Sequence, residues 1–205
     1  MTTYIMFDSV NADAIPPAAF AVAGYSDGLY NWPLASWNRY LKAYRVPITV
    51  LGGHTGARVC DCETGDLTPL SAALWAHAEI NQYGQRRPTI YCNASTVPAV
   101  SAQLTKLSLE FVRDVDLWVA KWDGAARLDF PGAVAKQYQH PPASGGNFDL
   151  SVVDPVWLGS VANPPVGLPA PVQGASDPVT TANVNGVQVT VDAATVAHLK
   201  LTGRL

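Results

Sequence analysis

The chain carries little charge, and that charge is not concentrated anywhere. Asp, Glu, Lys and Arg make up 14% of the 205 residues, and the formal net charge is −3. Nucleic-acid-binding surfaces cluster Lys and Arg, whereas here these residues are scattered singly, so we expect no nucleic-acid partner. No apolar run approaches the ~20 residues that a membrane-spanning helix needs, so we expect no membrane partner either.

The start of the sequence lacks the marks of a secretory leader. Met1-Thr2-Thr3 passes directly into the apolar residues 4–7, without a basic segment, a long apolar segment or a small-residue cleavage site. We therefore expect no signal peptide and synthesis in the cytoplasm.

Cysteine is scarce, with Cys60, Cys62 and Cys92 only. Their number is odd and they show no paired-ligand spacing. Cys60 and Cys62 share one face of a predicted strand, where buried free cysteines behave as small apolar residues. A zinc site that combines the three cysteines with His54 is the alternative, although zinc ligands usually come in tighter pairs. We expect no metal and no cofactor.

The apolar residues, 48% of the chain, suffice for a sizeable core and fall into short segments. Segments rich in Val, Ile, Tyr and Phe predict eight strands, and helical periodicity between them predicts three helices. This alternation favours an α/β fold, a short TIM-like (β/α) barrel with few helices in its second half. The predicted strands are 4–8, 20–24, 48–51, 58–63, 89–93, 117–121, 134–138 and 148–152, and the helices are 34–44, 69–83 and 95–107.

The composition changes after Leu158. Five prolines within residues 163–178 predict an extended linker. Residues 179–191 alternate around Asn185-Gly186, which predicts a hairpin. A helix-like stretch follows at 193–201.

These features divide the chain into a barrel, a linker and a C-terminal segment, at 1–160, 161–178 and 179–205. A segment of about 25 residues buries little surface alone. We therefore expect it to dock on the barrel, on a copy of itself or on a larger assembly.

The sequence Asp61-Cys62-Glu63 ends an apolar run and precedes a turn. Side chains two residues apart on a strand share a face, so Asp61 and Glu63 lie about 6.6 Å apart along it. Two carboxylates this close cannot ionise independently, and a raised-pKa acid beside an ionised partner suits glycosidic bond cleavage. The alternative is a polar strand end that pairs with Arg58 or Arg86.

Further acidic residues fall near strand ends, where β/α barrels carry their functional groups. Asp8 ends the first strand and Asp149 lies early in the last, and each has a turn or cap as its alternative. Asp27 is more typical of a turn, although its strand end faces the same mouth. Trp32 and Trp122 are expected to be exposed at loop ends, where aromatic rings can bind sugars.

Taken in order, these motifs resemble the family-25 glycoside hydrolases, the muramidase-type lysozymes that cut peptidoglycan. More closely, the chain resembles the lysozyme-like domain proteins of actinobacteria and their phages. The resemblance covers about residues 4–158. It rests on residues 7–9, 61–63, 88–93, 117–122, 137–138 and 148–151.

The resemblance implies an acidic cleft at the strand ends. Glu63 would protonate the leaving glycosidic oxygen, and Asp61 would orient the N-acetyl group of the substrate, which acts as the nucleophile. Asp8 and Asp149 would complete the carboxylate set. The groove would be lined by Tyr91, Trp118 and Tyr138. The chain departs from the family in having Lys136 where a Trp usually precedes Gln137-Tyr138.

Two other functions stay open. The barrel is alternatively a structural or glycan-binding component of a phage particle, such as a minor tail protein, whose contacts with other virion proteins or with itself use residues 164–205. The third alternative, a metal-dependent hydrolase, lacks a His pair with ligand spacing.

Overall fold

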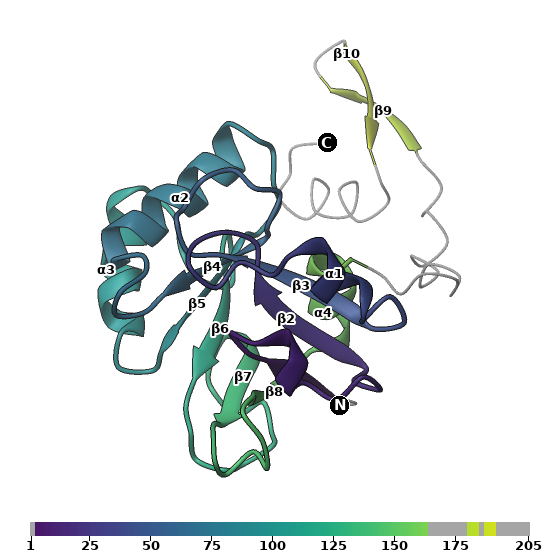
Figure 1. Cartoon of the computed structure of the whole chain (residues 1–205). Coiled ribbons are helices and arrows are strands. Elements are labelled where there is room, and N and C mark those ends of the chain that lie inside the picture. Colours follow the sequence, from purple (N-terminus) through teal and green to yellow (C-terminus); the bar gives the residue numbers. More distant parts are fainter. Residues whose placement is uncertain (1–2, 164–179, 185–186, 192–205) are drawn as a thin grey trace. The chain divides into compact units, whose positions relative to one another are not determined.

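The computed structural model describes residues 3–163, 180–184 and 187–191. The chain divides into two compact units, Met1–Leu168 and Pro169–Leu205. The first unit is a closed eight-stranded barrel, in which each strand pairs with the next and β8 pairs with β1 (Figure 1). Its strands are β1 (Tyr4–Asp8), β2 (Ala21–Tyr25), β3 (Tyr44–Thr49), β4 (Val59–Cys62), β5 (Thr89–Asn93), β6 (Asp116–Ala120), β7 (Ala133–Gln139) and β8 (Asp149–Val153).

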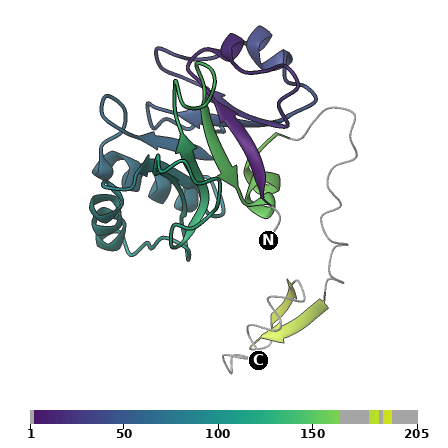
Figure 2. The ribbon, with the colours of Figure 1, turned by 90° about the horizontal axis from the view of Figure 1, so that it is seen from below.

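Seven of these strands run parallel, and β8 runs antiparallel to both of its neighbours. β1 and β8 lie side by side in Figure 2, as the purple and green strands. Because β8 runs in reverse, its first residue, Asp149, lies at the same end of the barrel as the last residue of β1, Asp8. The sequence correctly predicted the barrel of eight strands. The expected parallel pairing is found from β1 to β7.

The two longest helices of the barrel unit follow β4 and β5. α2 (Pro69–Asn81) begins after Thr68, whose side chain accepts a hydrogen bond from the Ser71 amide, and Pro69 occupies its first turn as predicted. α3 (Val97–Lys106) lies beside α2 against one side of the barrel (Figure 1).

The predicted helix at 34–44 is wrong in its second half. α1 ends at Asn38, and β3 already begins at Tyr44, four residues earlier than expected. Leu34 and Leu41 suggested a helical apolar stripe, yet both side chains are exposed, so no buried face extends the helix.

The short helix α4 (Pro155–Val161) was not predicted. It begins at Asp154, whose carboxylate accepts from the Val156 and Trp157 amides. Its residues Trp157, Leu158 and Val161 belong to the apolar cluster inside the barrel. α4 therefore closes the amino-terminal end of the barrel and leaves the carboxyl end open.

A second apolar cluster fills the layer between the barrel and the helices α2 and α3. It contains Cys60, Cys62 and Cys92, all free and buried, together with Trp75 and Leu104. The expectation that the cysteines face a packing layer is confirmed. His54 instead bonds Glu79 of α2, and the described residues include no group of three His, Cys, Asp or Glu side chains arranged for a metal ion.

The second unit contains a two-stranded antiparallel hairpin. β9 (Thr180–Val184) pairs with β10 (Val187–Val191), in register across residues 185–186, so the predicted hairpin is confirmed. The predicted linker from residue 164 onward and the helix-like stretch at 193–201 lie outside the described residues.

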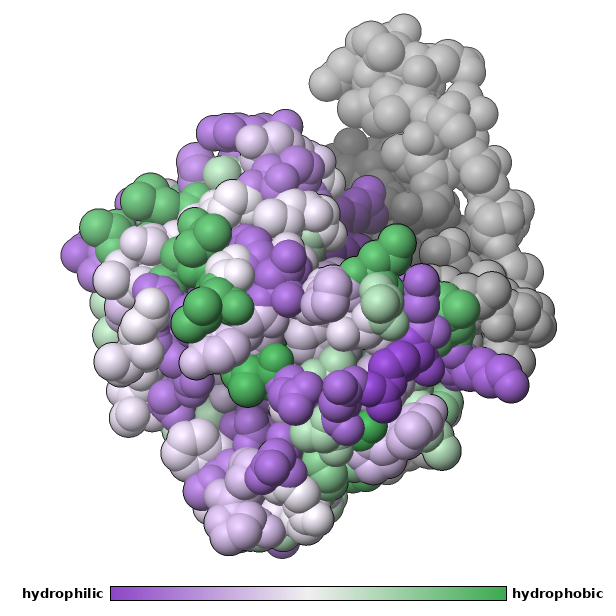
Figure 3. All heavy atoms as spheres, viewed as in Figure 1, coloured by the Kyte–Doolittle hydropathy of each residue, from purple (hydrophilic) through white to green (hydrophobic). Residues whose placement is uncertain are grey.

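The surface of the barrel is mixed in character. On the face seen in Figure 3, apolar side chains form separate groups among polar ones. No helix in the described part of the chain is both long and apolar enough to span a membrane.

Candidate active site at the carboxyl end of the barrel

Four carboxylates meet at the open end of the barrel. Asp8 ends β1, Asp61 lies on β4 with Glu63 just beyond it, and Asp149 begins β8. Their charges act on one another, since Asp149, Asp61 and Glu63 all raise the pKa of Asp8. The structure thus brings together the four acidic residues that the sequence selected.

Asp8 and Asp149 are direct partners across the antiparallel β1–β8 pair. Burial is the main cause that raises the pKa of Asp8 well above its ordinary value, and the charge of Asp149 is the next. Burial also raises the pKa of Asp149 to about 6, against the opposing effect of His140. The negative charge of Asp149 thus makes Asp8 harder to ionise.

Asp61 lies deeper than Glu63. Its side chain is 1% exposed, and burial, followed by the charge of Glu63, raises its pKa to about 8. Tyr25, at the end of β2, donates to Asp61 Oδ2 at 3.5 Å. Burial raises the pKa of Glu63 as well, opposed by hydrogen bonding from Tyr91. The pair therefore holds protons at higher pH than isolated carboxylates do.

Three carboxylate oxygens in this cluster have no partner among the described residues. They are Asp8 Oδ1, Asp61 Oδ1 and Glu63 Oε1, and all three are buried. Neither Arg58 nor Arg86 pairs with Asp61 or Glu63, because Arg58 bonds the carbonyl oxygens of Ser160 and Arg86 instead. Unpaired buried carboxyl groups are costly in a folded protein and are characteristic of functional sites.

Gln137 connects the cluster to its aromatic surroundings and was not selected from the sequence. Its Nε2 donates to Asp8 Oδ2 at 3.0 Å, and its Oε1 accepts from Tyr91 Oη at 3.0 Å and from Trp122 Nε1 at 2.6 Å. Because both of these donors point to one atom of the amide, the amide is oriented with its N–H toward Asp8. The signal available in the sequence was a polar residue that follows the apolar start of β7, residues 133–135.

The predicted aromatic residues take different positions. Tyr91 is 6% exposed and influences Glu63, whereas Trp122 is 52% exposed on the loop after β6. Trp118 has no exposed surface; it packs under Tyr91 at 4.8 Å between ring centres and donates to Ser151. Tyr138 is buried, and burial alone raises its pKa, without a contribution from the four carboxylates.

Two further expectations concern the loops at this end. Asp27 accepts from Thr49 Oγ1 and from the Val50 amide, so both of its oxygens join the end of β2 to the end of β3, as a turn residue does. Trp32 was expected to be exposed, which is wrong: it is 4% exposed and donates to the Ser9 carbonyl.

A hollow of about 460 Å³ adjoins Glu63 at the open end of the barrel. Loops that follow β4 and β5 line it, including Asp66, Leu67, Asn93 and Thr96. Of the four clustered carboxylates, Glu63 lines this hollow, whereas Asp8, Asp61 and Asp149 do not.

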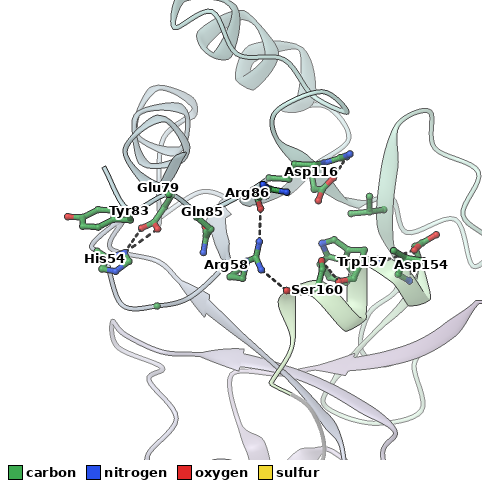
Figure 4. A pocket seen from close by; sticks show the side chains of 15 residues that line it. His54, Arg58, Glu79, Tyr83, Gln85, Arg86, Asp116, Asp154, Trp157 and Ser160 are labelled. Carbon is green, nitrogen blue, oxygen red and sulfur yellow. Dashed lines mark hydrogen bonds and ion pairs between the residues drawn. The ribbon is translucent and has the colours of Figure 1, made fainter. Parts of the chain in front are cut away.

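A larger hollow, of about 930 Å³, lies at the opposite end of the barrel (Figure 4). Arg58 lies in its middle, between Gln85 on one side and Ser160 of α4 on the other. Its acidic residues are already engaged, Asp116 with Arg87 and Glu79 with His54. None of the four clustered carboxylates lines this hollow, so its size alone does not make it the site.

The closed barrel has the fold of a solved family GH25 lysozyme. A family GH25 lysozyme from Aspergillus fumigatus matches 79% of this chain and 100% of its own, with 14% identity and a TM-score of 0.50. A muramidase from Trichobolus zukalii matches 74% of this chain and 93% of its own, with 17% identity and a TM-score of 0.49. No protein-family model and no curated protein matches the sequence. At this identity the likeness establishes the fold.

Proposed function

We propose that this protein is a muramidase-type glycoside hydrolase that acts on bacterial peptidoglycan. The observation that carries the proposal is the meeting of Asp8, Asp61, Glu63 and Asp149 at the open end of a lysozyme-like barrel. Cleavage of a glycosidic bond passes through a cationic, oxocarbenium-like transition state, which nearby carboxylates stabilise.

Glu63 is the general acid in this proposal. It is the member of the close pair that adjoins the hollow at the open end, while Asp61 lies beneath it. Its raised pKa keeps the proton available at a pH where an isolated glutamate has lost it. Glu63 donates this proton to the leaving glycosidic oxygen.

The other groups orient and stabilise. Asp61, held by Tyr25, orients the acetamido group of the substrate, which acts as the nucleophile. Asp149, whose pKa of about 6 leaves it ionised at neutral pH, supplies negative charge to the developing cation, and Asp8, held by Gln137, lies beside it. Trp122 offers an exposed aromatic face on which a sugar ring stacks.

The test is the release of soluble glycan from purified peptidoglycan. Glu63→Gln keeps the shape of the side chain but cannot donate the proton, so we expect at least a hundredfold loss of rate. Glu110→Gln is the matched control, because Glu110 is exposed at 61% and lies outside the cluster. Unchanged release by Glu63→Gln removes Glu63 as the acid.

A second candidate function rests on the hairpin of β9 and β10, which forms a unit of its own. In this version the barrel is a glycan-binding or architectural part of a phage particle, of the actinobacterial and actinophage lysozyme-like type, and the C-terminal segment contacts virion proteins or a copy of itself. After cytoplasmic synthesis the protein is built into the particle or released to act on the wall. The test compares the oligomeric state of the full chain with that of a chain ending at residue 163. A monomer in both forms counts against the assembly role.

A further inference from the structure

Lys136 is fully buried, which is unusual for a lysine. It precedes Gln137 on β7, and neighbouring residues of a strand face opposite sides, so Lys136 points away from the barrel interior that Gln137 enters. Its ammonium meets two carboxylates of the β6–β7 loop: Nζ lies 2.9 Å from Asp123 Oδ1 and 2.7 Å from Asp129 Oδ1.

The ion pairs shift the titration of both carboxyl groups. Hydrogen bonding from Lys136 is the first cause that lowers the pKa of Asp123, and it lowers the pKa of Asp129 to about 2. A buried ammonium is tolerated only when it is paired and hydrogen-bonded, so Lys136 and the loop depend on each other.

The loop that Lys136 holds also carries Trp122. The indole of Trp122 lies 4.7 Å from the His140 ring and donates to Gln137, which in turn donates to Asp8. The Lys121 amide donates to the Gln137 carbonyl and the Gly124 amide to the Tyr138 carbonyl, so the loop contacts β7 on both sides of Trp122. If the loop moves, Trp122 moves with it. The exposed aromatic face is then displaced, and the Gln137 amide oxygen loses one of its two hydrogen-bond donors.

We propose that Lys136 is a positioning residue for the sugar-binding groove: its ion pairs with Asp123 and Asp129 fix the loop so that Trp122 stays against Gln137. The proposal rests on the proposed function for its sugar, but the placement of Trp122 is measurable without any substrate. Lys136 touches no substrate itself. Its effect falls on the binding of the sugar that stacks on Trp122.

The experiment compares Lys136→Met with Lys121→Met. Lys121 also pairs with Asp123, at 3.0 Å, but its side chain is 44% exposed, which makes it a matched control. On soluble peptidoglycan fragments, Lys136→Met is expected to raise KM at least fivefold while kcat changes less than twofold. Lys121→Met is expected to leave both within twofold. An unchanged KM in a folded Lys136→Met protein overturns the proposal.

Trp122→Ala extends the test to a double-substitution cycle. Ala removes the aromatic face that Lys136 positions, so adding Lys136→Met to Trp122→Ala is expected to change KM less than twofold further. Effects that multiply instead overturn the proposal, because they would show that Lys136 acts independently of Trp122.

A readout without substrate separates this inference from the proposed function. The indole N–H resonance of Trp122 is assigned by its loss in Trp122→Phe, and Lys136→Met is expected to shift it and speed its exchange with water. If Lys136→Met does not fold, Asp129→Asn replaces it, because this variant leaves Lys136 paired with Asp123. Asp129→Asn is expected to give a smaller shift of the indole resonance and a smaller increase in its exchange rate. An unchanged resonance in the folded variant overturns the positioning role, whereas absence of hydrolysis by the wild-type protein overturns only the proposed function.

Discussion

Asp8 and Asp149 face each other across the pairing of β1 with β8 that closes the barrel; the charge of Asp149 raises the pKa of Asp8, while His140 lowers that of Asp149. Because each charge opposes the ionisation of the other, Asp149→Asn is expected to lower the pKa of Asp8. Carboxyl carbon-13 NMR titration measures this directly. Asp154→Asn, at the closed end of the barrel, is the control and is expected to leave the titration of Asp8 unchanged.

The raised pKa of Asp61 makes the free energy of unfolding depend on pH. Its pKa is about 8 in the folded protein, above the 3.8 of a free aspartate, so the folded state binds the proton more tightly. Its favourable contribution is complete below pH 3.8 and is lost as pH rises through 8. Asp61→Asn is therefore expected to unfold less readily than wild type at pH 8, by ~2 kcal/mol or more, and to show little difference at pH 4. Urea unfolding at both pH values measures this, and an equal difference at the two pH values contradicts it.

Replacement of Gln137 is expected to lower both stability and activity. Gln137→Met fills a similar volume but leaves Asp8 Oδ2, Tyr91 and Trp122 without their partner, which costs ~2 kcal/mol in the free energy of unfolding. Glycan release is expected to fall at least tenfold, since Asp8 loses its orientation. Gln139→Met, on the same strand, is the control for stability, and equal losses in both variants would contradict the role of Gln137.

Gly24 predicts a packing effect at the end of β2. A Cβ there would lie 2.5 Å from the Trp32 ring, which is itself buried and hydrogen-bonded. Gly24→Ala is expected to lower the unfolding free energy by ~2 kcal/mol, because the ring must move. At Gly159 in α4 a Cβ meets nothing within 4 Å, so Gly159→Ala is expected to raise it by ~0.5 kcal/mol. Thermal unfolding of both variants tests the contrast.

The sequence predicted the barrel well because its strands are short apolar runs bounded by Gly, Pro and Asp, and burial enforces that pattern. β1 and β5 have the predicted bounds. The antiparallel direction of β8 could not be predicted from the sequence, since alternation of apolar residues carries no information on strand direction.

The acidic residues of the site were found because carboxylates at strand ends stand out from their apolar surroundings. Gln137 and Tyr25 were missed, since an amide or a phenol within a strand is also compatible with ordinary packing. Their roles depend on side chains from β1, β4, β5 and the β6–β7 loop that come together only in the folded barrel.

The reversed last strand also decides where the barrel can be extended. Since β8 begins beside Asp8 and leads into α4, Asn163 pairs with Arg45 at the start of β3, at the end of the barrel opposite the four carboxylates. A tag that replaces the chain after Asn163 is therefore attached away from the acidic cluster. Changes in the β7–β8 connection, by contrast, alter the end of the barrel that carries Asp8 and Asp149.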